Sequence, residues 1–161
     1  MPNKMVEARP EEGIDTSTLE IWRTGPISNQ ELTPGHDRQI LALDINQDAT
    51  RVVTASADHG LRLYDLQSGE QVCELFGKDY GHHDWVSSCA FLADGRILSG
   101  GNDSLLCLWE RDAAVCTNLT GHNSNISKVQ VDSSSGTSNM AISSGYDAQL
   151  LLWDLDTHEC I

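Results

Sequence analysis

The sequence lacks the features of a membrane protein and of a secreted, disulfide-stabilised protein. No hydrophobic run approaches the roughly 18–20 residues that span a bilayer. Residues 1–13 mix basic and acidic side chains and lack the apolar stretch of a secretory signal. The five cysteines form no CxxC pair and lie in apolar stretches, so we expect them to be reduced and buried. These absences predict an intracellular protein, cytoplasmic rather than nuclear, that does not contact a membrane.

Positive charge is also scarce. Ten Lys and Arg residues against 24 Asp and Glu residues give a formal net charge of −14. Such a field repels nucleic acid and anionic membranes, so we expect neither as a partner. It attracts basic partners, which leaves open one alternative function, a reader of basic peptide tails.

The sequence offers little that could hold a cofactor or a metal ion. Gly100-Gly101-Asn102 does not precede a helical segment, as a phosphate-binding loop would. The only local cluster of metal-ligand type is His82-His83-Asp84, and no spacing in the sequence supplies it with a further ligand. We therefore expect no cofactor and no metal site.

What the sequence does contain is one pattern repeated three times. A short segment rich in small residues ends in Asp, and an aromatic residue followed by an acidic one begins six residues later. The three copies are 54–58 with Tyr64-Asp65, 99–103 with Trp109-Glu110, and 143–147 with Trp153-Asp154. The aromatic residues lie 45 and 44 residues apart. A constant period of this length indicates one supersecondary unit that is repeated.

Each period contains four short strand-forming segments separated by turn residues. In the first period the strand-forming segments are 40–45, 51–54, 61–64 and 71–75. No segment has a convincing apolar stripe of period 3.6, so we expect almost no helix. Four antiparallel strands in each unit describe a blade of a β-propeller, which buries its two faces against neighbouring blades.

A Gly-His pair before the first strand of each unit makes the pattern more specific. With the later Trp-Asp, or its variants, these pairs resemble the WD-repeat β-propeller family. The resemblance implies that a His, a Ser or Thr, an Asp and an aromatic residue form a hydrogen-bonded network in each blade. The matching residues are His36, Thr54, Asp58 and Tyr64; His82, Ser99, Asp103 and Trp109; and His122, Ser143, Asp147 and Trp153. Ser56 remains an alternative to Thr54 for the hydroxyl, because both lie on one face of the strand.

A set of His, Asp and Ser is also the composition of a hydrolase triad. A catalytic set is normally built once, in one cleft. Here the set occurs three times at one offset, once in each unit. We therefore interpret it as structural and expect no enzymatic activity.

The resemblance also predicts the domain organisation. Residues 1–17 form an acidic arm, and 18–34 supply the third and fourth strands of a partial blade. Residues 35–80, 81–120 and 121–161 form three blades, the last with a truncated fourth strand. We expect this all-β, partial propeller to remain open, because propellers close with four to eight blades. Its apolar faces then call for completion by a missing part of a truncated chain, by a second copy, or by another chain.

The family's usual activity is to bind other proteins through loops near the Gly-His pair and the turn Asp. The resemblance thus implies a non-catalytic scaffold for protein–protein interactions, with partners that the sequence does not identify. The candidate contact residues are Gln39, Leu41, Ala57, Trp85, Ser87, Asn102, Asn125, Ser127 and Tyr146. Trp85 and Tyr146 are the strongest because aromatic residues dominate binding hot spots. The alternative for Trp85 is that it packs against the edge of its own blade.

Overall fold

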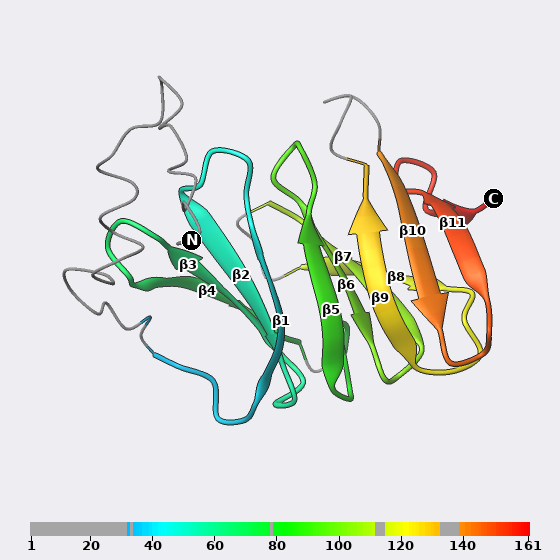
Figure 1. Cartoon of the computed structure of the whole chain (residues 1–161), viewed down its shortest axis with the longest axis horizontal. Helices are drawn as coiled ribbons and strands as arrows, with labels where there is room; N and C mark the ends of the chain where they lie inside the picture. The colour runs from blue at the N-terminus through cyan, green and yellow to red at the C-terminus, as the bar shows by residue number, and fades with distance from the viewer. Residues whose placement is uncertain (1–31, 33, 78, 112–114, 133–138) are drawn as a thin grey trace, which may run out of the picture. The chain divides into compact units, whose positions relative to one another are not determined.

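The computed structural model of the chain describes residues 32, 34–77, 79–111, 115–132 and 139–161 (Figure 1). The predicted arm, 1–17, lies outside the described residues, as does the predicted partial blade, 18–34, except for Leu32 and Pro34. Every regular element within the described ranges is a β-strand, as predicted. Among these residues no helix is long and apolar enough to cross a membrane.

The described strands form three separate four-stranded antiparallel sheets, and none of the three closes on itself. The first sheet has the order β1 (Ile40–Ile45), β2 (Arg51–Ser56), β3 (Leu61–Asp65) and β4 (Gln71–Leu75). The second has β5 (Val86–Phe91), β6 (Ile97–Gly101), β7 (Leu105–Trp109) and β8 (Cys116–Thr120). The third has β9 (Ile126–Val131), β10 (Met140–Gly145), β11 (Leu150–Asp154) and the two-residue β12 (Glu159–Cys160). Each sheet is therefore an up-and-down meander, the topology of a propeller blade.

The turn between the second and third strands of each sheet follows from its Asp. The carboxylate oxygen of Asp103 accepts a hydrogen bond from the backbone N–H of Leu105 at 3.2 Å, an Asx-type turn. The residue directly after each turn Asp has a left-handed backbone, with φ of 74° at His59, 67° at Ser104 and 61° at Ala148. The same local chemistry thus closes the same hairpin three times.

The sheets pack face to face through two apolar cores. The first core joins Val53, Ala55, Leu61 and Leu63 of the first sheet to Val86, Cys89, Phe91, Ile97 and Trp109 of the second. The second core joins Leu98, Leu106 and Leu108 of the second sheet to Ile126, Val129, Ala141 and Trp153 of the third. Strands β1, β5 and β9 lie side by side where the three sheets meet (Figure 1).

Hydrogen bonds between these first strands fix the register of neighbouring sheets. The backbone N–H of Phe91 donates to the carboxylate of Asp44 at 2.7 Å. The backbone N–H of Val129 donates to the hydroxyl of Ser88 at 3.1 Å. The second and third sheets can approach closely at Gly100 because glycine has no Cβ atom. A Cβ atom there would lie 2.6 Å from Cγ2 of Ile126.

All five cysteines are free thiols, but they are not all buried. Cys89 and Cys107 are buried, and Cys73 and Cys116 are half-buried. Burial, together with the nearby charge of Asp44, raises the pKa of Cys89 to about 12. The expectation of buried cysteines is wrong for Cys160, which is exposed on the last strand.

Candidate functional site

In the second sheet, the structure brings His82, Ser99, Asp103 and Trp109 into one hydrogen-bonded set. The indole N–H of Trp109 donates to Oγ of Ser99 at 2.8 Å. Oγ of Ser99 lies 2.8 Å from Nε2 of His82, and Nδ1 of His82 lies 3.1 Å from both carboxylate oxygens of Asp103. A neutral imidazole that accepts at Nε2 and donates at Nδ1 satisfies every member of the set.

The third sheet repeats this set with nearly the same distances. The indole N–H of Trp153 donates to Oγ of Ser143 at 2.8 Å. Nε2 of His122 lies 2.7 Å from that oxygen, and Nδ1 lies 2.8 Å from Oδ2 of Asp147. Two sheets therefore share one internal network.

The first sheet departs from the pattern at its aromatic member. His36 lies 2.7 Å from Asp58 through Nδ1 and 2.7 Å from Oγ1 of Thr54 through Nε2, so Thr54 and not Ser56 takes the hydroxyl role. The resemblance implied that Tyr64 belongs to this set, and that expectation is wrong. Its hydroxyl donates instead to the carbonyl of Pro34 at 2.8 Å, because the longer phenol reaches past the threonine. The network of this sheet therefore has three members.

The turn aspartates are held as carboxylates. Burial raises the pKa of Asp103, but this effect is outweighed by hydrogen bonds from His82 and from two backbone N–H groups, so the pKa lies below its usual value. Asp58 and Asp147 follow the same balance, with burial opposed by a histidine and backbone donors. Each carboxylate thus stays ionised and keeps its imidazole partner at neutral pH.

These sets are placed as structural units. The side chains of His82, His122, Ser99 and Ser143 are all buried inside their sheets. A hydroxyl nucleophile must face a cleft that a substrate can enter, and these hydroxyls already bond to both a histidine and an indole. The arrangement stabilises each blade, because loss of any one hydrogen bond would leave a buried polar group without a partner and lower the stability of the fold.

The candidate contact residues come together in pairs at the same end of each sheet. In each pair the residue before the turn Asp donates its backbone N–H to the carbonyl of the residue before the first strand. The pairs are Ala57 with Gln39 at 2.9 Å, Asn102 with Trp85 at 2.8 Å, and Tyr146 with Asn125 at 2.8 Å. The candidate residues chosen from the sequence pattern therefore occupy equivalent positions on all three described sheets.

The remaining three candidates are the extra residues of β-bulges. The pairing of the first and second strands shifts around Leu41, Ser87 and Ser127. A bulge redirects its side chain out of the regular alternation. The single hydroxyl hydrogen of Ser87 is shared between the carbonyl of Ile126 in the next sheet and that of Gly100, which lies 2.9 Å from Oγ. The sites of the second and third sheets are therefore tied together.

The candidate residues differ in how much of each is exposed to a partner. Tyr146 is 77% exposed and Trp85 is 44% exposed, so Trp85 does not pack fully against its own blade. Gln39, Leu41 and Ser127 are exposed, and Ser87, Asn102 and Asn125 are half-buried. The choice of Ala57 was wrong, because the residue is only 1% exposed and offers a partner no side-chain surface.

Arg62 lies beside the hydrogen-bonded set of the first sheet, and sequence reasoning missed it. Its guanidinium donates to the carbonyl of Gly35 and lies 4.0 Å from Asp58 and 3.7 Å from Glu74. The sequence feature that could have identified Arg62 is its charge, because the other two repeats have Cys107 and Leu151 at this position. In the described ranges, no group of three His, Cys, Asp or Glu side chains is arranged to hold a metal ion.

Three meander sheets with one internal His–Asp–hydroxyl set each define an open β-propeller of WD-repeat type. Comparison with known families agrees. The profile described as "DDB1- and CUL4-associated factor 12 beta propeller" matches residues 28–133, more than half of the chain, and "WD domain, G-beta repeat" matches residues 114–154. The chain belongs to the WD-repeat β-propeller family.

Individual relatives share this architecture over part of their length. The chain is 31% identical over 126 residues to the serine-threonine kinase receptor-associated protein of Gallus gallus, and 30% identical over 123 residues to that of Homo sapiens. These matches cover 76% and 74% of the chain but 33% of each relative, so the chain spans about a third of their length.

Solved structures support the fold. The WD40 repeats of RRP9 superpose with a TM-score of 0.73 at 20% identity, over 79% of this chain and 38% of that one. U3-55K gives the same TM-score at 21% identity, over 79% of this chain and 39% of that one. At these identities the likeness shows the fold alone.

Proposed function

We propose that this chain is a protein-interaction scaffold that binds its partner through the paired contact positions of the second and third sheets. Trp85 and Tyr146 are the anchors. The observation that carries the proposal is their placement. Each exposed ring sits on a backbone pair held by a 2.8 Å hydrogen bond, and Ser87 ties the two sites together. A rigid frame lowers the entropy cost of binding through such anchors.

The relatives support association with other proteins as the common activity, and their names point to different partners. One family profile is named for a factor associated with DDB1 and CUL4, and other relatives for association with a serine-threonine kinase receptor. WD-repeat propellers are in general non-catalytic scaffolds, and we propose that this chain is one too. The alternative function, reading basic peptide tails, receives no support from these relatives.

We also propose that the protein works inside the cell, in the cytoplasm rather than the nucleus. Five free thiols support a reducing compartment, because exposed and half-buried cysteines would be oxidised outside it. Fluorescence microscopy of a tagged chain tests this proposal, and accumulation in the nucleus or in the secretory pathway would contradict it.

Affinity purification of wild type and of Trp85→Ala and Tyr146→Ala variants tests the proposed site. Truncation of a hot-spot aromatic side chain costs about 2 kcal/mol of binding free energy, which weakens binding about 30-fold. We therefore expect each variant to lose the specific partners. Val115→Ala is the matched control, since Val115 is an exposed apolar residue in the turn between β7 and β8. Purified DDB1 is the first named partner to test by titration, because of the family profile.

The outcome that contradicts the site is retention of every partner by folded Trp85→Ala and Tyr146→Ala proteins. Circular dichroism and the urea midpoint establish that each variant is folded. Loss of binding in Val115→Ala to the same extent would also contradict the site, because it would show that the assay responds to any surface change.

A further inference from the structure

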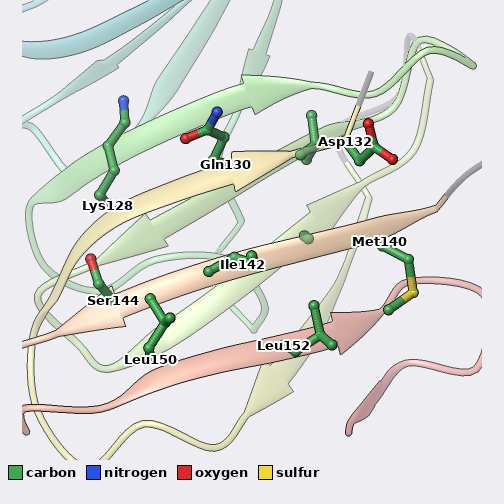
Figure 2. Close-up of a pocket in the computed structure, with 10 residues that line it drawn as sticks. Lys128, Gln130, Asp132, Met140, Ile142, Ser144, Leu150 and Leu152 are labelled. Carbon is green, nitrogen blue, oxygen red and sulfur yellow. The ribbon is translucent and has the colours of Figure 1, made fainter. Parts of the chain in front are cut away.

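One face of the third sheet exposes large aliphatic side chains, whereas the solvent-facing side of a sheet normally carries polar ones. Ile142 on β10 is 43% exposed, and Leu150 and Leu152 on β11 are 71% and 38% exposed. They lie on neighbouring strands and line a shallow pocket with Met140 at one end and Lys128 at the other (Figure 2). An apolar patch of this kind marks an interaction site.

The internal repeat shows what kind of surface this face is. Counting from the Trp of each network, Ile142, Leu150 and Leu152 occupy the positions of Leu98, Leu106 and Leu108 in the second sheet. In the first sheet the same positions are Val53, Leu61 and Leu63. Those six residues are at most 2% exposed, because each set packs against the next sheet along the chain. The face of the third sheet is therefore built as the same sheet-to-sheet interface.

The first sheet exposes the opposite half of this interface. Ile40, Leu43 and Ile45 on β1 are all exposed, and Leu43 is 62% exposed. Counting from the site pairs, they occupy the positions of Val86, Cys89 and Phe91 on β5, the residues with which the second sheet receives the first. The three described sheets thus carry one half of the sheet-to-sheet interface on the third sheet and the matching half on the first.

We propose that the face of Ile142, Leu150 and Leu152 docks on the β1 face of a second copy of this chain. The contact repeats the internal one, including a polar link. Asp44 accepts from the backbone N–H of Phe91 between the first and second sheets. Gln130 occupies the position of Asp44 in the third sheet, and its amide oxygen is placed to accept from the backbone N–H of Ile45 of the second copy.

This head-to-tail contact is heterologous, so a pair of chains makes it twice when the rotation closes. Two copies then join six sheets, within the four to eight blades of closed propellers. Both apolar faces of both chains are covered in such a ring. A face-to-face contact between two copies of the same leucine face would leave the β1 faces exposed.

The mass in solution, measured by light scattering across protein concentration, gives the first test. A closed pair has twice the 17.6 kDa mass of the chain, about 35 kDa. Leu150→Arg and Leu43→Arg each place a charge in one face, and their exposure in the single chain leaves its own folding unchanged. We expect each variant to associate at least about tenfold more weakly. Val115→Arg, outside both faces, is the control and should associate like wild type.

Mixing the two variants separates this arrangement from the others. Leu43→Arg keeps the face of Ile142, Leu150 and Leu152 intact, and Leu150→Arg keeps the β1 face intact. In a mixture of the two variants these intact faces form one unaltered contact, so we expect a mixed pair. A wild-type protein that stays monomeric at 100 µM overturns the proposal, since another occupant must then cover the faces. Loss of association in Leu150→Arg alone, with none in Leu43→Arg, shows a face-to-face pair and also overturns it.

Discussion

The three glycines of the Gly-His pairs offer a graded test of how tightly each blade is packed. A Cβ atom on Gly81 would lie 2.7 Å from Cη2 of Trp109, and φ at Gly81 is +85°. A Cβ atom on Gly121 would lie 2.7 Å from Cη2 of Trp153, but the backbone there is not left-handed. A Cβ atom on Gly35 would meet no heavy atom within 4 Å. Gly81→Ala therefore suffers both backbone strain and a steric clash with the indole, Gly121→Ala suffers the clash alone, and Gly35→Ala suffers neither.

The magnitudes follow from these two penalties. A left-handed alanine costs about 1–2 kcal/mol, and forcing a methyl group against a buried ring costs about 1–3 kcal/mol. We expect Gly81→Ala to lose about 2–5 kcal/mol of unfolding free energy and Gly121→Ala about 1–3 kcal/mol. Gly35→Ala should change stability by less than about 0.5 kcal/mol, since the site has open space.

Equilibrium urea unfolding at one fixed protein concentration measures these differences, because self-association would otherwise shift the midpoint. Tryptophan fluorescence reports the transition. Equal losses at Gly35 and Gly81 would refute the reasoning, since they would show that the indole does not define the space above each Gly-His pair.

Three further predictions concern the networks and the thiols. Ser99→Ala leaves the buried indole N–H of Trp109 and Nε2 of His82 without a partner and should cost about 2–5 kcal/mol in urea unfolding. Thr54→Ala removes only the partner of Nε2 of His36 and should cost about 1–3 kcal/mol; equal losses would contradict the different role of the tyrosine. The lowered pKa of each turn aspartate stabilises the fold above pH 3.8, and this stability should fall as pH drops below 3.8 toward the folded-state values; urea midpoints that stay flat from pH 5 to pH 2.5 would contradict it. Iodoacetamide at pH 8 should label exposed Cys160 at once and Cys89 only after unfolding, as followed by mass spectrometry; rapid labelling of Cys89 would contradict its burial.

Much of the fold could be predicted from residue patterns. The expected strands 40–45 and 71–75 match β1 and β4, because alternating apolar residues between turn residues leave few other options. The period identified the repeated sheets, since a blade needs a neighbour to bury its faces.

The parts that could not be predicted depend on distances across the sheet. Thr54 and Ser56 point to the same side of β2, so only the register selects Thr54. The link from Tyr64 to Pro34 depends on the path of the chain before the first strand. Ala57 is buried in the turn before Asp58, and composition does not reveal that burial. The proposed docking face could not be predicted, because only the packing of the sheets shows that the equivalent residues of the first two sheets are buried.

We conclude that the repeated His, Asp, Ser and Trp residues of the second and third sheets are locked structural sets, held by hydrogen bonds inside each sheet. Hydrogen exchange of the tryptophan side-chain N–H groups, followed by NMR with Trp→Phe assignments, tests it most directly. We expect slow exchange for Trp109 and Trp153, whose indoles donate to buried serines at 2.8 Å, and fast exchange for the exposed Trp85. Fast exchange at Trp109 and Trp153 in the folded protein would contradict it.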